Sequence, residues 1–432
     1  MIHIDSPNSP LYQPNITDLE RVKRWVAISD SRMRRFTKNA TRMSQNLKPD
    51  ESTPYMSYDR NGLFYVQLGL GKIDTVTSRG IDLLFDTSSD LSWTQCEDCT
   101  NCFPQNQPLF SPKSSLTYRP YPCNECLGGQ CNQDHCMFEK SYKDGTHVRG
   151  ILSTDKLFTI SPLINYEEMF TIQHNTSFFC IGMVRNNIIT GNLGMGNGRF
   201  SILSQLGSRA NYQFSYCLQE YTDNSKSWYF LPMYLRFGDD VERLPNMVTT
   251  PLLSVNNHAY YYLVLNDISV NGINLNIPNH LFRANPDHSG GTIIDSGSTL
   301  SYLVPGAFNI VFEAISSYMN NNYPFLRITT ITLPGVSACW ESRISDTPYF
   351  EFPTLTFHLE DADLHVDPSD MELTFPYRGS VRYRNLYCLT VAKAEENGIN
   401  MIGAYHQTNQ RFIYNVGNAK LSFAKDNCAT RG

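Results

Sequence analysis

The sequence predicts a mainly β-structured protein (all-β with a few short helices) built from two similar lobes, and three observations lead to this fold class. An apolar pair, an aspartate, a hydroxyl residue, a small residue and a serine occur at residues 84–89 and again at 293–298, an offset of 209 residues. The chain is rich in Tyr (25), Phe (24) and Pro (23), which favours strands and turns. Long helical periodicity is rare. A repeat this long indicates two related lobes rather than a solenoid, and a two-fold axis would bring the copied aspartates together.

The length of 432 residues allows two ordinary cores and an appendage. We expect the appendage at residues 1–55, an N-terminal β-lobe at residues 56–250 with a Cys-rich insert at 96–136, and a C-terminal β-lobe at residues 251–432. Residues 1–50 carry nine Lys or Arg and five Asp or Glu, whereas the whole chain has a net charge of −6. A basic arm therefore precedes an acidic body. Residues 17–20 (TDLE) have the form of a capping box and predict a short helix that could cover an acidic cleft.

A basic arm can also bind nucleic acid, but this arm lacks interleaved aromatic residues, and the acidic body would repel phosphates. We therefore expect no nucleic-acid partner. No apolar run approaches about 18 residues, so we expect no membrane span. No apolar signal-peptide core precedes the arm, so the chain either begins after such a signal or lacks one.

Local patterns place several elements. Short segments rich in aromatic and β-branched residues predict strands at residues 64–68, 169–172, 261–265 and 354–359. Apolar residues at helical spacing predict a helix at 306–320, and a shorter helix is expected at 201–206. Neither helix carries a catalytic pattern, so both are interpreted as core packing. Residues 191–196 contain too many glycines for a strand. They also do not form a phosphate-binding motif, because neither GxGxxG nor a P-loop lysine is present.

The twelve cysteines bear on the cellular compartment in which the protein resides. One subset (Cys99, Cys102, Cys123 and Cys126) has the spacing of a zinc site, but three more cysteines occur in the same stretch and five are scattered elsewhere. Disulfide bonds in a secreted protein would explain all twelve, with a pairing that the sequence leaves open. Asn-x-Ser/Thr triplets at residues 15–17, 39–41 and 175–177 are compatible with a secreted glycoprotein.

Each aspartate motif alone has a simple structural explanation, because an Asp at a strand end is often solvated and a neighbouring Ser or Thr often caps a turn. Their paired placement, together with other motifs in the same order, resembles the pepsin-like aspartic proteases and, within them, the plant nepenthesin-type branch. The resemblance extends from about residue 60 to residue 428. Its markers are DTSSDLSWTQC at residues 86–96, the Cys-rich insert, YKDG at 142–145, GNLGMG at 191–196, IDSG at 294–297 and MIG at 401–403, and residues 2–12 resemble the start of a prosegment.

The resemblance implies a bilobal pepsin-like acid protease fold with the active site at the lobe junction. It implies an aspartic-type endopeptidase, a hydrolase made as a zymogen, in which Asp86 and Asp295 share one proton and activate a water molecule at acid pH. This chemistry requires no cofactor and no metal. The expected partner is a peptide or protein substrate, the expected state is a monomer, and the expected location is outside the cell in the apoplast, with the vacuole as the alternative.

The neighbours of the two aspartates match supporting residues of the family. Thr87 and Ser296 match hydroxyls that hydrogen-bond across the lobe junction, whereas Ser89 and Ser298 match hydroxyls that can donate to the outer carboxylate oxygens. Gly297 follows in the second loop. The segments that contain Gly194 and Gly403 match those that thread behind each aspartate loop, and the remaining matches are Tyr142 for the flap over bound peptide and Trp93 for the aromatic residue that supports it.

The chain departs from the family pattern most clearly at Ser88, where relatives have glycine. A CH2OH group there could crowd the aspartates or tilt Asp86, and a shift of about 1 Å can cost on the order of a hundredfold in rate. Lys143 replaces a flap glycine, GLGK at residues 69–72 replaces the usual Gly-Thr-Pro, and Asn415 stands where relatives often have Asp. The alternative is therefore a catalytically impaired pepsin-fold protein that serves as a binding or inhibitor protein.

Overall fold

The computed structural model describes residues 55–428, except 59–63, 74–77, 98, 100–101, 103–104, 106, 127–129, 133, 142–146, 160–169, 180–189, 220–232, 254, 256–258, 286–288, 330–334, 343–348, 379–382 and 397. The predicted helix of the basic arm, the glycosylation triplets at 15–17 and 39–41, and Tyr142 lie outside the described residues. The boundaries predicted at residues 55 and 250 fall inside the strands β1 and β14, so the division into domains stays a prediction.

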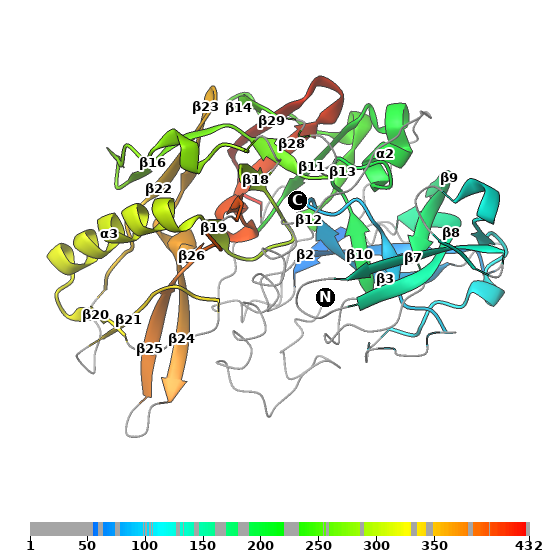
Figure 1. Cartoon of the computed structure of the whole chain (residues 1–432), viewed down its shortest axis with the longest axis horizontal. Helices are drawn as coiled ribbons and strands as arrows, with labels where there is room; N and C mark the ends of the chain where they lie inside the picture. Colours follow the sequence, from blue (N-terminus) through cyan, green and yellow to red (C-terminus); the bar gives the residue numbers. More distant parts are fainter. Residues whose placement is uncertain are drawn as a thin grey trace.

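A large sheet forms the N-terminal lobe, on the right in Figure 1. Its main path is β4-β10-β3-β2-β8-β7-β6, and β1, β5, β9 and β12 pair with members of that path or with one another. The described strands are β1 (Tyr55–Tyr58), β2 (Phe64–Leu70), β3 (Arg79–Asp86), β4 (Trp93–Thr94), β5 (Arg119–Pro120), β6 (Gln130–Asn132), β7 (His135–Ser141), β8 (His147–Thr159), β9 (Phe170–Phe179), β10 (Gly191–Gly194) and β12 (Met233–Tyr234).

Three smaller sheets form the C-terminal lobe, on the left in Figure 1. One contains β15 (Tyr261–Leu263), β18 (Thr292–Ile294), β27 (Asn400–Ile402), β19 (Ser301–Leu303) and β26 (Val391–Lys393). Another contains β17 (Ile273–Asn274), β16 (Leu265–Val270), β22 (Leu355–Leu359) and β23 (Ala362–Val366). The third contains β20 (Leu326–Ile328), β21 (Cys339–Ser342), β25 (Tyr383–Leu389) and β24 (Glu372–Arg378).

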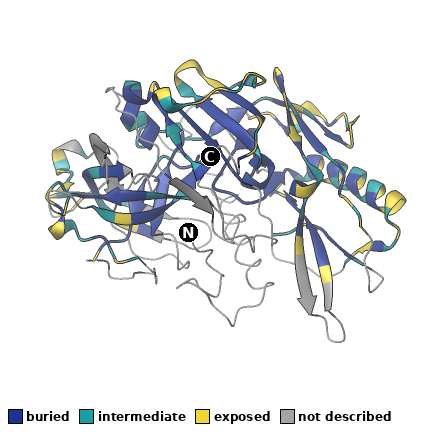
Figure 2. Cartoon of the chain, turned by 180° about the vertical axis from the view of Figure 1, so that it is seen from behind, coloured by how far each residue is buried: buried dark blue, intermediate teal, exposed yellow. Residues whose placement is uncertain are grey.

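A central sheet joins strands that are far apart in the sequence. Its order is β13 (Arg236–Phe237), β11 (Gln213–Cys217), β28 (Gln410–Asn415), β29 (Lys420–Lys425) and β14 (Val248–Pro251). A disulfide bond between Cys217, the last residue of β11, and Cys428 holds the segment after β29 against this sheet. Figure 2 shows that buried residues run continuously from this sheet into both lobes, as expected for a fold with its site at their junction.

Two α-helices occur in the described part of the chain, and both were predicted. In α2 (Ile202–Leu206) the Ser201 hydroxyl caps the first turn by accepting a hydrogen bond from the Ser204 amide at 3.2 Å. The helix α3 (Pro305–Asn322) begins with proline at its first position and buries one apolar face. Short 3-10 helices connect other elements: η2 (Pro112–Ser114), η3 (Cys123–Glu125), η4 (Gly207–Ala210), η5 (Gly238–Asp240), η6 (Asn279–Leu281), η7 (Pro368–Met371), η8 (Ala404–Gln407) and η9 (Val416–Asn418).

The strand predictions are confirmed as β2, the start of β9, β15 with the first residue of β16, and β22. The argument against a strand at residues 191–194 is wrong, because this stretch forms β10. A Cβ added to Gly191 would lie 1.7 Å from the Trp93 carbonyl oxygen, so glycine is needed here for close strand packing rather than for a turn.

The prediction of disulfide bonds is confirmed. Bonds join Cys99 to Cys102, Cys123 to Cys131, Cys126 to Cys136, Cys217 to Cys428 and Cys339 to Cys388, and Cys96 is also disulfide-bonded. The four cysteines with zinc-site spacing are therefore oxidised and cannot serve as thiolate ligands. Among the described residues, no group of three or more His, Cys, Asp or Glu side chains is arranged to hold a metal ion.

Candidate active site

The two aspartates occupy matching positions in the two lobes. Asp86 ends β3, which pairs in parallel with β10, and Gly194 lies directly opposite Asp86. Asp295 follows β18, which pairs in parallel with β27 in the same way. Both aspartates are 0% exposed, so the fold carries two carboxyl groups into the interior at the ends of strands.

The same hydrogen bond stabilises the segment behind each loop. The Gly194 amide donates to the Ser92 hydroxyl at 3.0 Å, and the Gly403 amide donates to the Ser301 hydroxyl at 2.9 Å. Each partner in the second lobe lies 209 residues after its counterpart, which is also the offset of the aspartates. The internal repeat in the sequence is thus a structural repeat in which equivalent residues make equivalent contacts.

Hydrogen bonds between the two loops bring the aspartates to one place. The Thr87 amide donates to the Ser296 hydroxyl at 3.3 Å, and the Ser296 amide donates to the Thr87 hydroxyl at 2.9 Å. The Ser296 hydroxyl also donates to the Phe85 carbonyl oxygen at 3.2 Å. Because Thr87 and Ser296 directly follow the aspartates, these bonds hold the two loops that carry the aspartates together at the junction.

Backbone amides face both carboxylates, and one side chain adds to them. The Gly297 amide donates to Asp295 Oδ1 at 2.8 Å, and the Ser88 amide donates to Asp86 Oδ1 at 3.0 Å. The Ser88 hydroxyl donates to the same Asp86 oxygen at 2.8 Å. The CH2OH group of Ser88 thus gives Asp86 a side-chain hydrogen bond, whereas Gly297 has no side chain to give one to Asp295.

The two remaining serines, Trp93 and Tyr142 complete the set of predicted site residues. The Ser89 hydroxyl accepts a hydrogen bond from the Leu91 amide at 3.3 Å. The Ser298 hydroxyl is buried and has no hydrogen-bond partner within the described residues, so the donation to a carboxylate implied by the resemblance is not seen there. Trp93 is buried in a small apolar cluster with Val148 and Leu152. Tyr142 lies outside the described residues, so its place relative to Trp93 stays a prediction.

Two further buried groups near these loops have shifted pKa values. Burial raises the pKa of Asp82, in β3, to about 6, although Gln107 donates a hydrogen bond to its carboxylate. Burial lowers the pKa of His406 to about 3, and its ring nitrogens lie 2.8 Å from the Ser301 hydroxyl and 2.9 Å from the Thr390 hydroxyl. Both side chains are therefore predominantly neutral at about pH 5.

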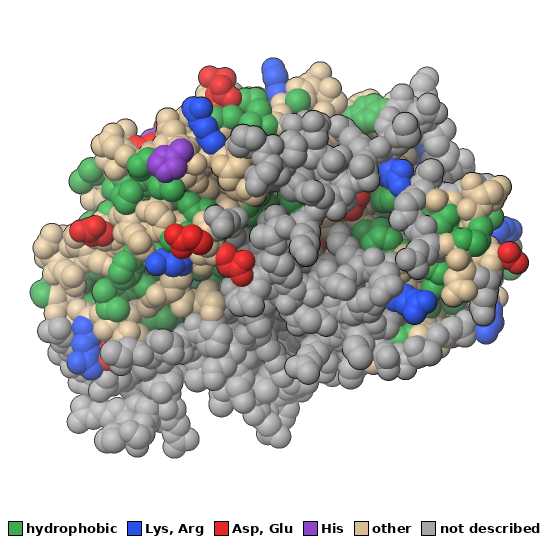
Figure 3. Space-filling view, viewed as in Figure 1, with side chains coloured by type: hydrophobic (Ala, Val, Ile, Leu, Met, Phe, Trp, Pro, Cys, Tyr) green, Lys and Arg blue, Asp and Glu red, His purple; other side chains and the backbone are tan. Residues whose placement is uncertain are grey.

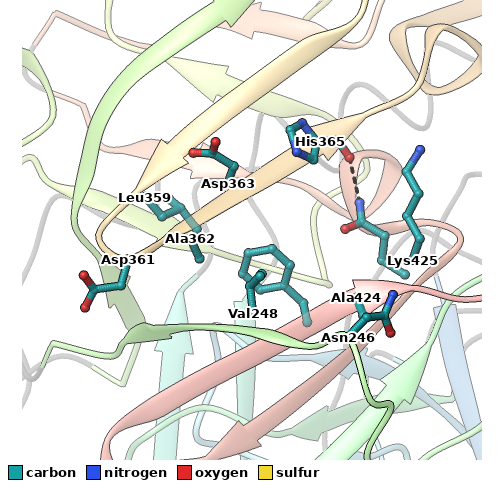
Figure 4. Close-up of a pocket in the computed structure, with 11 residues that line it drawn as sticks. Asn246, Val248, Leu359, Asp361, Ala362, Asp363, His365, Ala424 and Lys425 are labelled. Atoms are coloured by element: carbon teal, nitrogen blue, oxygen red, sulfur yellow. Dashed lines mark hydrogen bonds between the residues drawn. The ribbon is translucent and has the colours of Figure 1, made fainter.

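A surface groove of roughly 730 Å³ lies elsewhere, between β14, β23 and β29 of the C-terminal lobe (Figure 4). Its walls combine apolar side chains such as Val248 with Asp363, His365 and Lys425. The Gln410 amide donates to the His365 carbonyl oxygen at 3.0 Å. None of its lining residues belongs to the aspartate loops, so it is distinct from the junction. Figure 3 shows that charged side chains of both signs are interspersed over the described part of this lobe.

Family models and known proteins match the sequence of this chain. The family models Xylanase inhibitor N-terminal and Xylanase inhibitor C-terminal match residues 64–232 and 260–425. Aspartic proteinase nepenthesin-2 from Nepenthes gracilis is 30% identical over 429 residues, covering 96% of this chain and 87% of that protein. This chain belongs to the pepsin-like aspartic protease family. A second relative in the family, aspartic proteinase nepenthesin-1 from the same organism, is 28% identical and covers 99% of this chain and 89% of its own length.

Solved structures share the pepsin-like fold of this family member. The protein edgp has a TM-score of 0.66 at 18% identity, with 90% of this chain and 98% of that chain covered. Basic 7S globulin from soybean has a TM-score of 0.66 at 16% identity, with 88% and 99% covered. At these identities the likeness concerns the fold alone. No described helix is long and apolar enough to cross a membrane.

Sequence reasoning missed a set of residues behind the loops: Tyr216, Tyr414 and Gln407. The alternating Phe214 and Tyr216 of β11 and the continuous apolar run 412–414 of β28 could have marked both tyrosines as core positions. A buried tyrosine hydroxyl usually needs a hydrogen-bond partner, which is the signal that points to a polar network at this site.

Proposed function

We propose that this protein is an aspartic-type endopeptidase that hydrolyses peptide bonds of protein substrates at acid pH. The observation that carries the proposal is the pair of buried carboxyl groups, Asp86 and Asp295, held together by reciprocal hydrogen bonds between Thr87 and Ser296. The sequence relatives are named aspartic proteinases, which supports peptide or protein substrates.

The chemistry follows from the pairing. Two adjacent buried carboxyl groups cannot both ionise cheaply, so they hold one proton between them and titrate as a pair, for which the aspartic proteases are the standard example. In that state the ionised group accepts a proton from an attacking water molecule, and the protonated group donates to the carbonyl oxygen of the scissile bond. The Ser88 and Gly297 amides would orient the two carboxyl groups during this reaction.

The alternative, a binding protein without turnover, was based on the expected disturbance of Asp86 by Ser88. The hydrogen bond from the Ser88 hydroxyl to Asp86 Oδ1 argues for the enzyme, because it stabilises a charged Asp86 and one carboxyl group of the pair must be ionised in order to accept a proton. We therefore place the enzyme first and retain the alternative as an outcome of the test.

The test measures cleavage of a denatured protein substrate as a function of pH, with and without a statine-type compound, whose hydroxyl mimics the transition state between the two carboxyl groups. Asp86→Asn and Asp295→Asn should each abolish cleavage and its inhibition. Asp361→Asn is the matched control, because it removes an exposed carboxylate at a left-handed turn position that Asn tolerates. Cleavage by either active-site variant at the parent rate would refute the proposal.

We further propose that the protein is a secreted, monomeric zymogen, located in the apoplast or alternatively in the vacuole, in which the basic arm neutralises the ionised aspartates at neutral pH. Acidification would protonate carboxylates and weaken these ion pairs. A chain that lacks residues 1–54 but keeps β1 should cleave substrate without prior acid treatment. If the shortened chain still needs acid activation with the same time course as the full chain, the arm is not an inhibitory prosegment.

A further inference from the structure

A line of buried polar groups lies behind the two aspartate loops. The hydroxyl oxygens of Tyr216 in β11 and Tyr414 in β28 are 3.0 Å apart, and both side chains are at most 1% exposed. The Tyr216 hydroxyl donates to Gln407 Oε1 at 2.5 Å. The Gln407 side-chain amide in turn donates to the Ile402 carbonyl oxygen at 2.9 Å.

The chemistry of these groups gives the line one direction. An amide oxygen only accepts, so Tyr216 must use its single proton on Gln407. Tyr414 must then donate to Tyr216, because the single Tyr216 proton is already used. Both tyrosine hydroxyls thus have an orientation imposed by their neighbours.

The line reaches the loop of Asp295 from behind. It starts at Tyr414 and ends at the carbonyl oxygen of Ile402 in β27, the strand that pairs with the one leading to Asp295. The same carbonyl oxygen accepts the Asp295 amide at 3.0 Å. Burial raises the pKa of Tyr216 and Tyr414, and the Asp295 carboxylate acts in the same direction on both. Both hydroxyls therefore stay protonated, and both lie close enough to Asp295 to feel its charge.

We propose that Tyr216, Tyr414 and Gln407 are positioning residues that hold the Ile402 carbonyl oxygen, and through it the backbone of Asp295, in place relative to Asp86. A fully satisfied buried network is rigid, whereas a missing member leaves a neighbour without its partner. Its effect on turnover rests on the proposed function, because only a reacting pair of aspartates is sensitive to small displacements.

The first experiment compares Tyr414→Phe with the control Tyr118→Phe. The Tyr118 hydroxyl also pairs with another hydroxyl, that of Ser153 at 2.7 Å, but neither residue belongs to the aspartate loops. We expect Tyr414→Phe to lower kcat at least about tenfold with KM within about threefold of the parent, because the binding surface is unchanged while the loop shifts. Tyr118→Phe should keep the parent kcat. Should Tyr414→Phe fail to fold, Tyr216→Phe is measured in the same way.

The second experiment does not depend on turnover. Unfolding is measured for Gln407→Leu, Tyr414→Phe and the double variant, because both residues hydrogen-bond the same Tyr216 hydroxyl. Coupled groups should give a double variant about as stable as the weaker single variant. Additive losses, or a kcat in Tyr414→Phe equal to that of the parent, would overturn the proposal. A parent without turnover but with coupled losses would reject the proposed function and leave the positioning network intact.

Discussion

Ser88 offers the sharpest prediction, because its hydroxyl makes one identifiable bond to Asp86 Oδ1 at 2.8 Å. A hydrogen bond to a charged group contributes about 1.5–3 kcal/mol. Since one pH unit corresponds to about 1.36 kcal/mol, loss of this bond should make protonation of the carboxylate easier by about one to two pH units. Ser88→Gly and Ser88→Ala should therefore move the acid limb of the kcat/KM profile to higher pH by that amount.

The assay is the pH dependence of kcat/KM for a peptide substrate, which reports ionisations of the free enzyme. The two variants separate the hydroxyl from the bulk of the side chain, because alanine keeps the Cβ atom and loses only the hydrogen bond. We expect both variants of Ser88 to behave alike, with maximal rates within about tenfold of the parent.

Three results would refute this reasoning in different ways. An acid limb that does not move in either variant would mean that the Ser88 hydroxyl does not stabilise the charged carboxylate. Recovery in Ser88→Gly but not in Ser88→Ala would mean that steric crowding decides the rate. A parent with almost no turnover and a large gain in Ser88→Gly would support the alternative of a binding protein.

The remaining predictions concern stability. The pKa of Asp82 is about 6 in the folded chain and 3.8 as reference, so the stability that it contributes is present below pH 3.8 and is lost as pH rises through 6. In Asp82→Asn, thermal or urea unfolding should show about 3 kcal/mol less loss of stability between about pH 3 and 8, and an unchanged pH dependence would contradict this. The pH dependence that His406 contributes has the opposite sign, because its stabilisation is present above pH 6.5 and is lost as pH falls through about 3. In His406→Gln, on the order of 5 kcal/mol of the acid destabilisation should therefore disappear. A steeper loss of stability in acid would show that the folded state does not require the neutral ring. Replacing both Cys217 and Cys428 by alanine should lower the free energy of unfolding by up to about 5 kcal/mol, because that bond closes a loop with a sequence separation of 211, and unfolding midpoints equal to those of the parent would exclude this role.

The elements that the sequence predicted correctly are those whose pattern is local. The helix α3 shows its apolar face within a few turns, and strands such as β22 show their aromatic and β-branched residues within five positions. β10 was missed because Gly191 is required by the close approach of the Trp93 carbonyl oxygen, and Trp93 is 98 residues away from Gly191 in the sequence. A glycine required by a distant backbone looks, in the sequence, like a glycine required by a turn.

By itself the sequence determined the lobed architecture, the place of Asp86 and Asp295 in it and the use of disulfide bonds, because a repeat and a cysteine count are properties of the chain alone. Only the tertiary structure decided which cysteines pair, which way the Ser88 hydroxyl turns and that two core tyrosines connect through Gln407 to the Ile402 carbonyl oxygen. The physical reason is that each of these bonds needs a partner that the folded chain brings within reach, and, apart from Asp86 for the Ser88 hydroxyl, those partners lie far away in the sequence.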